Sequence, residues 1–481
     1  MGDLKEKLKR VAETIGPDRI ETDPSVTEKF AVDGQRPKGV VFPRNTREAS
    51  EGVKLASREN LSLIPRGSGT KMGMGYPPSR VDLIMGSSRM DHMLDVDTAN
   101  LTITVEAGVK FRDIQARLAT EDDRCYLPLE DLTTNQDEPI CSERANSGCF
   151  LPMDPPFCET ATLGGIVATN SSGPRRLLYR FPRDQLLGVR FVAPGGDIIG
   201  TGGKTVKNVS GYDISKLMVG SAGSLGFISE MTFKLLPLPE HMETLFLMCT
   251  TLGEAAALTE AILNTPLFPA AVEIMNPRAC EMLSAANVPV GASNAYGVAV
   301  AMEAFAPAVK RMTDEIQAMG KKMGTMEDIS LEEDDHRRFW LTVSHLQNAG
   351  HKGSGNSIAF QLTYPISLMT RVVSHAEKAL MERNVDHSLL VHGGTGACVV
   401  ILSADPEGSE IEKTVVPLVL DLLTLCRREG GNLMVLNAPP ALKSEVPMWG
   451  EVGDDLQVMK RIKTQVDPSG IFSPGRFVGG L

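Results

Sequence analysis

Residues 65–75 read Pro-Arg-Gly-Ser-Gly-Thr-Lys-Met-Gly-Met-Gly, and this glycine-rich stretch says more about the fold than any other part of the chain. Four glycines within nine residues cannot serve core packing. They let backbone N–H groups approach an anion with no Cβ in the way, which is typical of a concave nest for phosphate. Neither the P-loop spacing nor the Rossmann fingerprint is present, because no helix follows directly. A mobile surface loop is the alternative interpretation.

The residues before this loop predict a strand, a helix and a second strand. Residues 40–43 form a short apolar run that is typical of a buried strand. Asn45 is predicted to cap the following helix, and Glu48, three residues later, to complete a capping box. The helix is expected to end near Glu59, and residues 61–64 are expected to form the strand that leads into the loop.

Two further glycine-rich clusters follow along the chain. Residues 160–170 read Thr-Ala-Thr-Leu-Gly-Gly-Ile-Val-Ala-Thr-Asn. The third cluster has two parts. Residues 207–213 read Lys-Asn-Val-Ser-Gly-Tyr-Asp, and residues 220–226 read Gly-Ser-Ala-Gly-Ser-Leu-Gly. Three such clusters in one chain favour a bound ligand over three unrelated turns.

In this order, the clusters resemble the flavin domain of FAD-linked oxidases of the vanillyl-alcohol-oxidase type, which includes glycolate oxidases and D-lactate dehydrogenases. The resemblance is strong over roughly residues 30–240, and residues 467–477 resemble the C-terminal signature of the same family. Within the family, residues 173–176 and 438–440 look most like the FAD-binding E subunit of glycolate oxidase.

The resemblance implies an α+β fold, with a PCMH-type FAD-binding domain of two subdomains followed by an FAD-linked oxidase C-terminal domain. We expect an N-terminal helix over residues 1–30, the FAD-binding domain over 31–239 and the C-terminal domain over 240–481. A polar insertion is expected within the FAD-binding domain, at about residues 130–152. Pro237 and Pro239 mark the boundary, because proline disfavours helix interiors and central strands.

The second half of the chain alternates longer apolar runs, which indicates an antiparallel sheet with helices on one face. The charged segment from Met323 to Asn356 gives no clear pattern. The expected strands are 243–250, 270–276, 296–303, 357–364, 388–392, 397–403 and 432–437, and the expected helices are 253–264, 306–319, 366–383 and 411–428.

The cofactor implied by the resemblance is FAD, held between the loop at 65–75 and the cluster at 160–170. A tight helix-start turn without a ligand is the plainer explanation for the second cluster. Attachment is expected to be noncovalent, because no histidine lies between His92 and His241. The predicted cofactor-binding residues are Pro65, Arg66, Gly67, Ser68, Gly69, Thr70, Gly73, Ala161, Thr162, Gly164, Gly165, Ala168, Thr169, Asn170, Gly226, Ile228 and Arg476.

Oxidation of a 2-hydroxy acid, the chemistry that the resemblance implies, needs a base for the hydroxyl proton and a cation for the carboxylate. Arginine suits the carboxylate because its planar fork matches two oxygens. Ordinary surface charge is the alternative for each candidate arginine. The candidates are Arg175, Arg176, Arg180 and Arg183, with Arg476 added by resemblance.

His392 is the predicted catalytic base. Related dehydrogenases carry the pattern H-x-G-D-G-N-x-H there, and His392, Gly394 and Gly396 match it. Thr395, Ala397 and Val399 replace the acid, the amide and the second histidine, so the motif offers no group to orient the imidazole. These departures favour a flavin-bearing subunit that carries electrons from hydroxy-acid oxidation on a partner. The alternatives are a self-sufficient FAD-dependent 2-hydroxy-acid dehydrogenase and, as a minor one, a structural subunit.

Composition and resemblance together predict the cellular setting of the oxidoreductase that the resemblance implies. A net charge of −11 argues against sequence-independent nucleic-acid binding, and no apolar run is long enough to span a membrane. A cytoplasmic location is expected, with membrane association only through partners. The resemblance implies a related catalytic flavoprotein and an iron–sulfur subunit as those partners.

Eight cysteines are present, and four of them cluster within 34 residues. They lack any C-x-x-C pair, so ordinary thiols are favoured over a zinc or iron–sulfur site and no metal is predicted. The clustered cysteines are Cys125, Cys141, Cys149 and Cys158.

Overall fold

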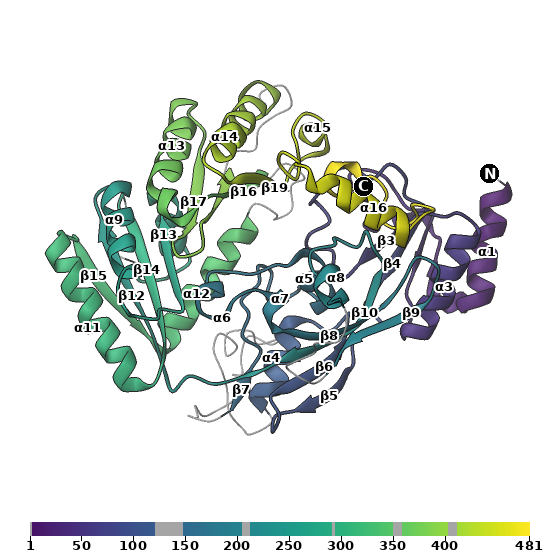
Figure 1. Ribbon diagram of the computed structural model, residues 1–481, viewed down its shortest axis with the longest axis horizontal. Coiled ribbons are helices and arrows are strands. Elements are labelled where there is room, and N and C mark those ends of the chain that lie inside the picture. The colour runs from purple at the N-terminus through teal and green to yellow at the C-terminus, as the bar shows by residue number, and fades with distance from the viewer. Residues whose placement is uncertain (1, 121–147, 204–211, 291–293, 350–357, 403–410) are drawn as a thin grey trace.

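The computed structural model describes residues 2–120, 148–203, 212–290, 294–349, 358–402 and 411–481 (Figure 1). Its N-terminal half contains two sheets, as expected for two subdomains, and its C-terminal half is built on one large sheet. The first sheet has the order β1-β2-β4-β3, and its two pairings from β2 to β3 are parallel. The strands are β1 Ile20–Glu21, β2 Gly39–Val41, β3 Leu63–Arg66 and β4 Leu83–Gly86.

The second sheet of the N-terminal half is antiparallel, in the order β5-β6-β10-β8-β9. Its strands are β5 Met93–Asp97, β6 Thr102–Glu106, β8 Leu186–Val192, β9 Ile198–Gly202 and β10 Phe227–Lys234; a short separate pair joins β7 Cys149–Phe150 to β11 Leu236–Pro237. The helices of this half are α1 Gly2–Ile15, α2 Pro24–Thr27, α3 Thr46–Arg58, α4 Phe111–Thr120, α5 Leu163–Thr169, α6 Arg176–Tyr179, α7 Pro182–Gln185 and α8 Ile214–Met218.

Helix α3 begins as the sequence predicts, at Asn45. The Asn45 side-chain oxygen accepts a hydrogen bond from the Glu48 backbone N–H at 2.9 Å. A cap of this kind stabilises a helix by about 1 kcal/mol. The Glu48 carboxylate accepts from the backbone N–H of Arg44 rather than of Asn45, so the return bond of the predicted capping box lies one residue earlier.

The C-terminal half contains an eight-stranded antiparallel sheet in the order β15-β12-β14-β13-β17-β18-β16-β19. Its strands are β12 His241–Cys249, β13 Ala271–Met275, β14 Tyr296–Ala304, β15 Glu327–Glu332, β16 Ile358–Thr363, β17 His387–His392, β18 Ala397–Leu402 and β19 Asn432–Asn437. The helices of this half are α9 Leu252–Leu263, α10 Pro277–Ala285, α11 Ala306–Met323, α12 Glu333–Ala349, α13 Met369–Glu382, α14 Val416–Arg428, α15 Pro440–Lys443 and α16 Asp455–Val466.

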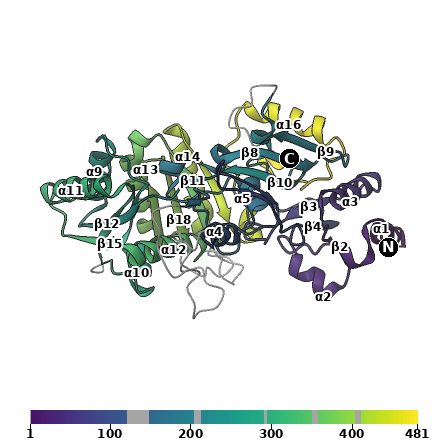
Figure 2. The same ribbon diagram turned by 90° about the horizontal axis from the view of Figure 1, so that it is seen from below.

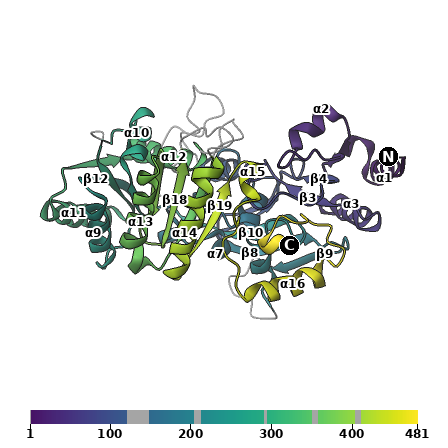
Figure 3. The ribbon, with the colours of Figure 1, turned by 90° about the horizontal axis from the view of Figure 1, so that it is seen from above.

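Helices cover both faces of this sheet, so the expectation of a single covered face is wrong. Figures 2 and 3 show α10 and α12 on one side and α9, α11, α13 and α14 on the other. Strand β12 explains why, because it places apolar side chains on both faces of the sheet. Leu245 and Leu247 pack into the core under α9 and α11, whereas Phe246 lies against Phe339 of α12, with ring centroids 5.8 Å apart. Strand β15 and helix α12 occupy most of the segment that gave no pattern in the sequence.

The C-terminal segment returns to the N-terminal half, so the last residues of the domain expected at 240–481 pack against the FAD-binding domain. The Leu63 backbone N–H donates to the Ile471 carbonyl at 2.7 Å, and the Ser473 N–H donates to the Leu63 carbonyl at 3.0 Å. Phe472 is fully buried in the core that contains β3. Figure 1 shows α16 and the C-terminus beside β3 and β4. The N-terminal helix expected over residues 1–30 corresponds to α1, and β1, which also lies in that range, pairs with β2.

Several predicted features lie outside the described residues, namely the polar insertion at 130–147, Cys125, Cys141 and residues 204–211 of the third cluster. Cys149 and Cys158 are buried, and Cys149 belongs to β7 rather than to an insertion. Within the described part of the chain, no three His, Cys, Asp or Glu side chains gather as a metal site. No helix among the described residues is long and apolar enough to cross a membrane.

Candidate cofactor and substrate site

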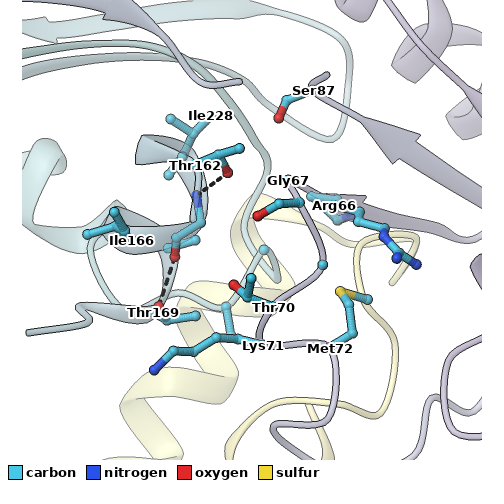
Figure 4. Close-up of a pocket in the computed structure, with 18 of the residues that line it drawn as sticks. Arg66, Gly67, Thr70, Lys71, Met72, Ser87, Thr162, Ile166, Thr169 and Ile228 are labelled. Atoms are coloured by element: carbon cyan, nitrogen blue, oxygen red, sulfur yellow. Dashed lines mark hydrogen bonds between the residues drawn. The ribbon is translucent and has the colours of Figure 1, made fainter. Parts of the chain in front are cut away.

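A pocket of about 1000 Å³, which includes space open to solvent, lies where β3 ends and α5 begins. Its size is within the usual range for small-molecule sites. All the predicted cofactor-binding residues line it except Gly73 and Asn170. Figure 4 shows the loop after β3 on one side of this pocket and α5 with Ile228 on the other. The structure therefore brings the first two glycine clusters together as opposing walls.

The two walls touch at Gly67, which leaves no room for a side chain. A Cβ built on Gly67 would lie 2.0 Å from the Thr162 hydroxyl oxygen. Thr162 is itself fixed, because it caps α5 by accepting from the Gly165 N–H. Gly69 has a φ of +85°, and a Cβ there would lie 2.6 Å from the Arg66 guanidinium. Both glycines are thus required by the protein's own packing, whatever ligand the loop holds.

The far end of the loop is held by Arg476. Its Nη2 donates to the carbonyls of Met72 at 2.8 Å and Met74 at 2.9 Å. Its Nη1 lies 3.6 Å from the Asp33 carboxylate, which also pairs with Lys443. Arg476 lines the pocket, and these contacts use its Nη2 and its charge to support the loop, although its Nη1 makes no hydrogen bond with a described residue. They speak against its predicted use as the ligand of a substrate carboxylate.

The C-terminal end of α5 presents polar groups that have no hydrogen-bond partner among the described residues. Asn170 ends the helix in the left-handed conformation, with a φ of 47°, and its Oδ1 is buried and unpartnered. The hydroxyls of Ser171 and Ser221 are buried and unpartnered as well. Buried polar groups are normally satisfied. Their clustering beside the pocket therefore indicates that a polar ligand completes them.

A second set of polar residues, called here the polar cluster, lies next to this end of the pocket. Its members come from both halves of the chain. Ser171 lines the pocket, and the neighbouring Ser172 hydroxyl accepts from Arg176, which joins the two sites. The polar cluster consists of Asp154, Arg176, Glu273, Tyr364 and His392.

His392 has an acidic partner, contrary to the expectation from its motif. Its Nδ1 lies 2.7 Å from the Glu273 carboxylate, and both side chains are almost fully buried. Glu273 on β13 and His392 on β17 are directly opposed in the sheet. The motif showed no acid because the partner comes from a neighbouring strand, 119 residues earlier in the chain. The prediction that nothing orients this imidazole is wrong.

Burial sets the protonation of the His392–Glu273 pair. It lowers the pKa of His392 well below its ordinary value, and the nearby Arg176 lowers it further. It raises the pKa of Glu273 well above its ordinary value, while the positive charge of Arg176 acts in the opposite direction. His392 Nε2 makes no hydrogen bond with a described residue and is the ring nitrogen left for a ligand.

Arg176 is the only candidate arginine of the 175–183 segment that the described structure places in the polar cluster. Its Nε and Nη2 are buried with no hydrogen-bond partner among the described residues. Arg180 and Arg183 are exposed. Arg175 pairs with Glu303, Nε to Oε1, at 2.6 Å, and Tyr179 donates to the same carboxylate. Arg175 therefore joins the two halves of the chain, and Arg176 remains free for a ligand.

Asp154 fixes the segment that carries both arginines. Its carboxylate accepts the backbone N–H groups of Gly173 at 3.1 Å and Arg175 at 2.8 Å. Burial raises its pKa to about 6, although Arg175 and Arg176 oppose that shift. At neutral pH the carboxylate is mostly ionised, so it balances part of the charge of Arg176.

Comparison with known proteins connects these two sites to a family. Residues 37–129 and 141–202 match the FAD binding domain model, and residues 238–477 match the model "FAD linked oxidases, C-terminal domain". Together the two models cover most of the chain. The chain belongs to the FAD-linked oxidases.

Individual relatives of this FAD-linked oxidase agree. Glycolate oxidase subunit GlcD of Bacillus subtilis is 26% identical over 98% of this chain and 96% of its own length. The mitochondrial D-lactate dehydrogenase [cytochrome] of Arabidopsis thaliana is 23% identical over 92% of this chain and 73% of its own. The structure of p-cresol methylhydroxylase superposes with a TM-score of 0.76 at 14% identity, covering 99% of this chain and 97% of that one, which establishes the PCMH-type fold alone.

The glycolate oxidase relative found is the D subunit, whereas the sequence reading favoured the E subunit. The family and its cofactor are as predicted, and this protein is an FAD-dependent oxidoreductase. The finer likeness to the E subunit stays a prediction.

The residues of this FAD-linked oxidase fit its cofactor. Gly67 and Gly69 form a bulk-free loop suited to phosphate, and the unpartnered groups at the end of α5 offer polar contacts. No described residue that lines the pocket is a histidine or a cysteine, which agrees with noncovalent attachment.

Sequence reasoning missed three functional candidates of this FAD-linked oxidase. Glu273 and Tyr364 carry no motif and are recognised only through their neighbours in the polar cluster. Lys71 stood inside the quoted glycine-rich loop but was passed over, although a charged side chain within such a loop was a signal. Lys71 lines the pocket, and Figure 4 shows its amino group on the side of Thr169, away from Ser87.

Proposed function

We propose that this chain itself oxidises a 2-hydroxy acid to the 2-oxo acid, with Arg176 holding the carboxylate and His392 taking the hydroxyl proton. The observation that carries the proposal is the buried contact between His392 Nδ1 and Glu273. It supplies the orienting acid whose apparent absence favoured a purely electron-carrying subunit. Relatives named as a glycolate oxidase subunit and a D-lactate dehydrogenase support the substrate class.

The roles follow from the atoms that are left without partners. Arg176 Nε and Nη2 form a two-donor fork that matches two carboxylate oxygens. His392 Nε2 accepts the hydroxyl proton while Glu273 holds the opposite ring nitrogen and so fixes the tautomer. The Cα–H bond breaks as the carbonyl forms, and FAD, when bound, supplies the acceptor for that hydrogen and its electron pair. Tyr364, whose hydroxyl has no partner in the described structure, offers a further hydrogen bond to the substrate oxygen.

Anaerobic mixing tests this proposal directly. The isolated, FAD-loaded chain should lose its flavin absorbance on addition of D-lactate or glycolate, and His392→Gln should remove that reaction. The matched control is His375→Gln, which changes an exposed histidine of α13. Persistent flavin absorbance with every 2-hydroxy acid offered would overturn the proposal.

A subunit role is the second candidate, because the Bacillus subtilis relative is named as a subunit. In that case a related flavoprotein and an iron–sulfur protein would be partners, in the cytoplasm or at the membrane surface. Flavin absorbance that is stable with the isolated chain but lost once co-purifying subunits are added would support this second role. The two candidates are not exclusive, since a catalytic chain can also pass its electrons to partners.

A further inference from the structure

We propose that Lys71 is the second cation of the substrate site, so that Arg176 and Lys71 hold the two carboxylates of a 2-hydroxy dicarboxylic acid. The inference rests on the proposed function and adds a substrate class to it. Lys71 lines the pocket from the loop between β3 and β4. Arg176, the first residue of α6, is not part of that lining, but its hydrogen bond to the Ser172 hydroxyl places it beside Ser171, which does line the pocket.

The charge of Lys71 has no counterpart among the described residues. Its amino group makes no hydrogen bond or ion pair there, although most lysines of the described chain that are removed from solvent have one. Lys443, for example, pairs with Asp33, and Lys463 donates to Asp467 and two carbonyls. Lys71 is only partly exposed, and a charge that is partly removed from water without a partner is costly. An anionic ligand removes that cost, so the ligand is expected to be negative at this point.

Among the described residues, the charged group that acts on Lys71 is another cation, Arg176. Burial and, to a smaller extent, the charge of Arg176 together lower the pKa of Lys71 to about 8. Two cations at one end of a cavity repel each other until negative charge lies between them. Among the described residues, Asp154 and Glu273 act on Arg176 but not on Lys71.

A monocarboxylate does not need both cations. The free Nε and Nη2 of Arg176 satisfy two oxygens of one carboxylate, which leaves Lys71 unsatisfied. A second carboxylate on the substrate gives Lys71 its own partner. The cofactor pyrophosphate is a less suitable partner, because Figure 4 places the Lys71 amino group beside Thr169, on the opposite side of the loop from Ser87 and the Gly67 backbone.

Binding of non-reactive acids to the FAD-loaded protein tests the inference. Malonate carries two carboxylates and acetate carries one, and neither has a hydroxyl group to oxidise, so binding can be followed through the flavin spectrum without turnover. We expect the parent to prefer malonate over acetate, and Lys71→Met to weaken malonate binding by about 10-fold, which is about 1.4 kcal/mol, with little change for acetate. FAD content is measured first for every variant. Lys38→Met is the matched control, because it removes one exposed lysine from the same half of the chain.

The pH dependence of malonate affinity is a specific test of Lys71, because a lysine with a purely structural role would not affect it. Lys71 is charged below its pKa of about 8 and neutral above it, so malonate affinity should fall as the pH rises through that value. Lys71→Met should abolish this dependence, and Lys71→Arg should extend tight binding to higher pH. Bound malonate should itself raise the pKa of Lys71.

The outcomes separate this inference from the proposed function. Unchanged malonate affinity and pH profile in Lys71→Met, together with loss of binding in Arg176→Met, would overturn the role of Lys71 alone. Unchanged binding in both variants would overturn the proposed function as well. Loss of FAD from Lys71→Met, with malonate affinity normal in the fraction still loaded, would assign Lys71 to the cofactor and also overturn the inference.

Discussion

The cofactor pocket and the polar cluster lie next to each other, yet the chain builds them in different ways. The pocket comes mainly from contiguous runs, in which neighbouring residues 64–72 and 161–171 form opposing walls. The polar cluster takes single residues from β13, β17, α6 and the segments beside them. Contiguous loops of backbone donors suit a cofactor that every member of a family binds. Single side chains can be exchanged one at a time, so under the proposed function the polar cluster is where a change of substrate would be made without a change of cofactor.

A substitution of His392 gives the strongest test of this difference between the cofactor pocket and the polar cluster. We expect His392→Gln to lower the rate of substrate oxidation by about 10²- to 10⁴-fold, the usual contribution of general-base catalysis. FAD affinity should stay unchanged, because His392 does not line the cofactor pocket. Rapid anaerobic mixing and flavin titration measure the two quantities. A variant that lost its FAD as well would show that pocket and cluster are one site rather than two.

At Gly67 we expect the reverse of the His392 result, because a substitution there acts on FAD binding. A valine there would meet the Thr162 hydroxyl and force the two walls apart. We expect Gly67→Val to weaken FAD binding by at least about 100-fold, which is about 2.7 kcal/mol, with a smaller effect on the melting temperature of the apoprotein. Gly200→Val on β9 is the control, because a Cβ there meets nothing within 4 Å. Equal FAD occupancy in both variants would remove the loop from the cofactor site.

Glu273 should control how the reaction depends on pH. While the Glu273–His392 pair keeps its shared proton, Nε2 also keeps its hydrogen and cannot act as a base. Burial raises the pKa of Glu273, so the pair loses that proton at a higher pH than a free carboxyl would. The rate should therefore rise with pH through this raised pKa.

Glu273→Gln leaves an oxygen that still accepts from His392 Nδ1 but removes the titrating carboxyl. We expect the rise in rate to move to lower pH, because burial holds the pKa of His392 below its ordinary value. The maximal rate should fall about 10-fold, since a neutral amide stabilises the charged imidazole less than a carboxylate does. Glu260→Gln, at an exposed position of α9, is the control. A pH–rate profile identical to that of the parent would contradict the assigned pair.

The smallest effect is expected at Asp33, which helps Arg476 to hold the loop from outside the pocket. Asp33→Asn should weaken FAD binding about 5-fold, or about 1 kcal/mol, because Arg476 keeps its bonds to the carbonyls of Met72 and Met74. The rate of oxidation at saturating FAD should not change. Asp386→Asn, which alters an exposed carboxylate, is the control. If Asp33→Asn changed the oxidation rate but not the FAD affinity, Asp33 would support the substrate site rather than the cofactor loop.

The sequence predicted the pocket better than the cluster for a physical reason. Glycine, threonine and asparagine in a run report on backbone geometry, which is a local property, so the residues around Gly67 and Gly164 could be found without a structure. The pairing of Glu273 with His392 depends on strand order, which brings β13 beside β17. Nothing near His392 in the sequence records that neighbour, and the search for an acid within its motif gave the wrong answer. Helix α12 was missed for a related reason, since its charged start hides the apolar face that contains Phe339 and Trp340.

The return of the C-terminal segment to β3 also sets an order of events during synthesis. Met72 and Arg476, which are joined by a hydrogen bond in the folded protein, are separated by 404 positions in the chain. A ribosome therefore completes the first sheet and its loop long before the residues that support them emerge. Until Ile471 and Ser473 arrive, β3 has an open edge, which is a template for unwanted pairing with other chains. FAD consequently binds when the chain is nearly complete. A chain released early from a stalled ribosome would lack the cofactor and would tend to aggregate.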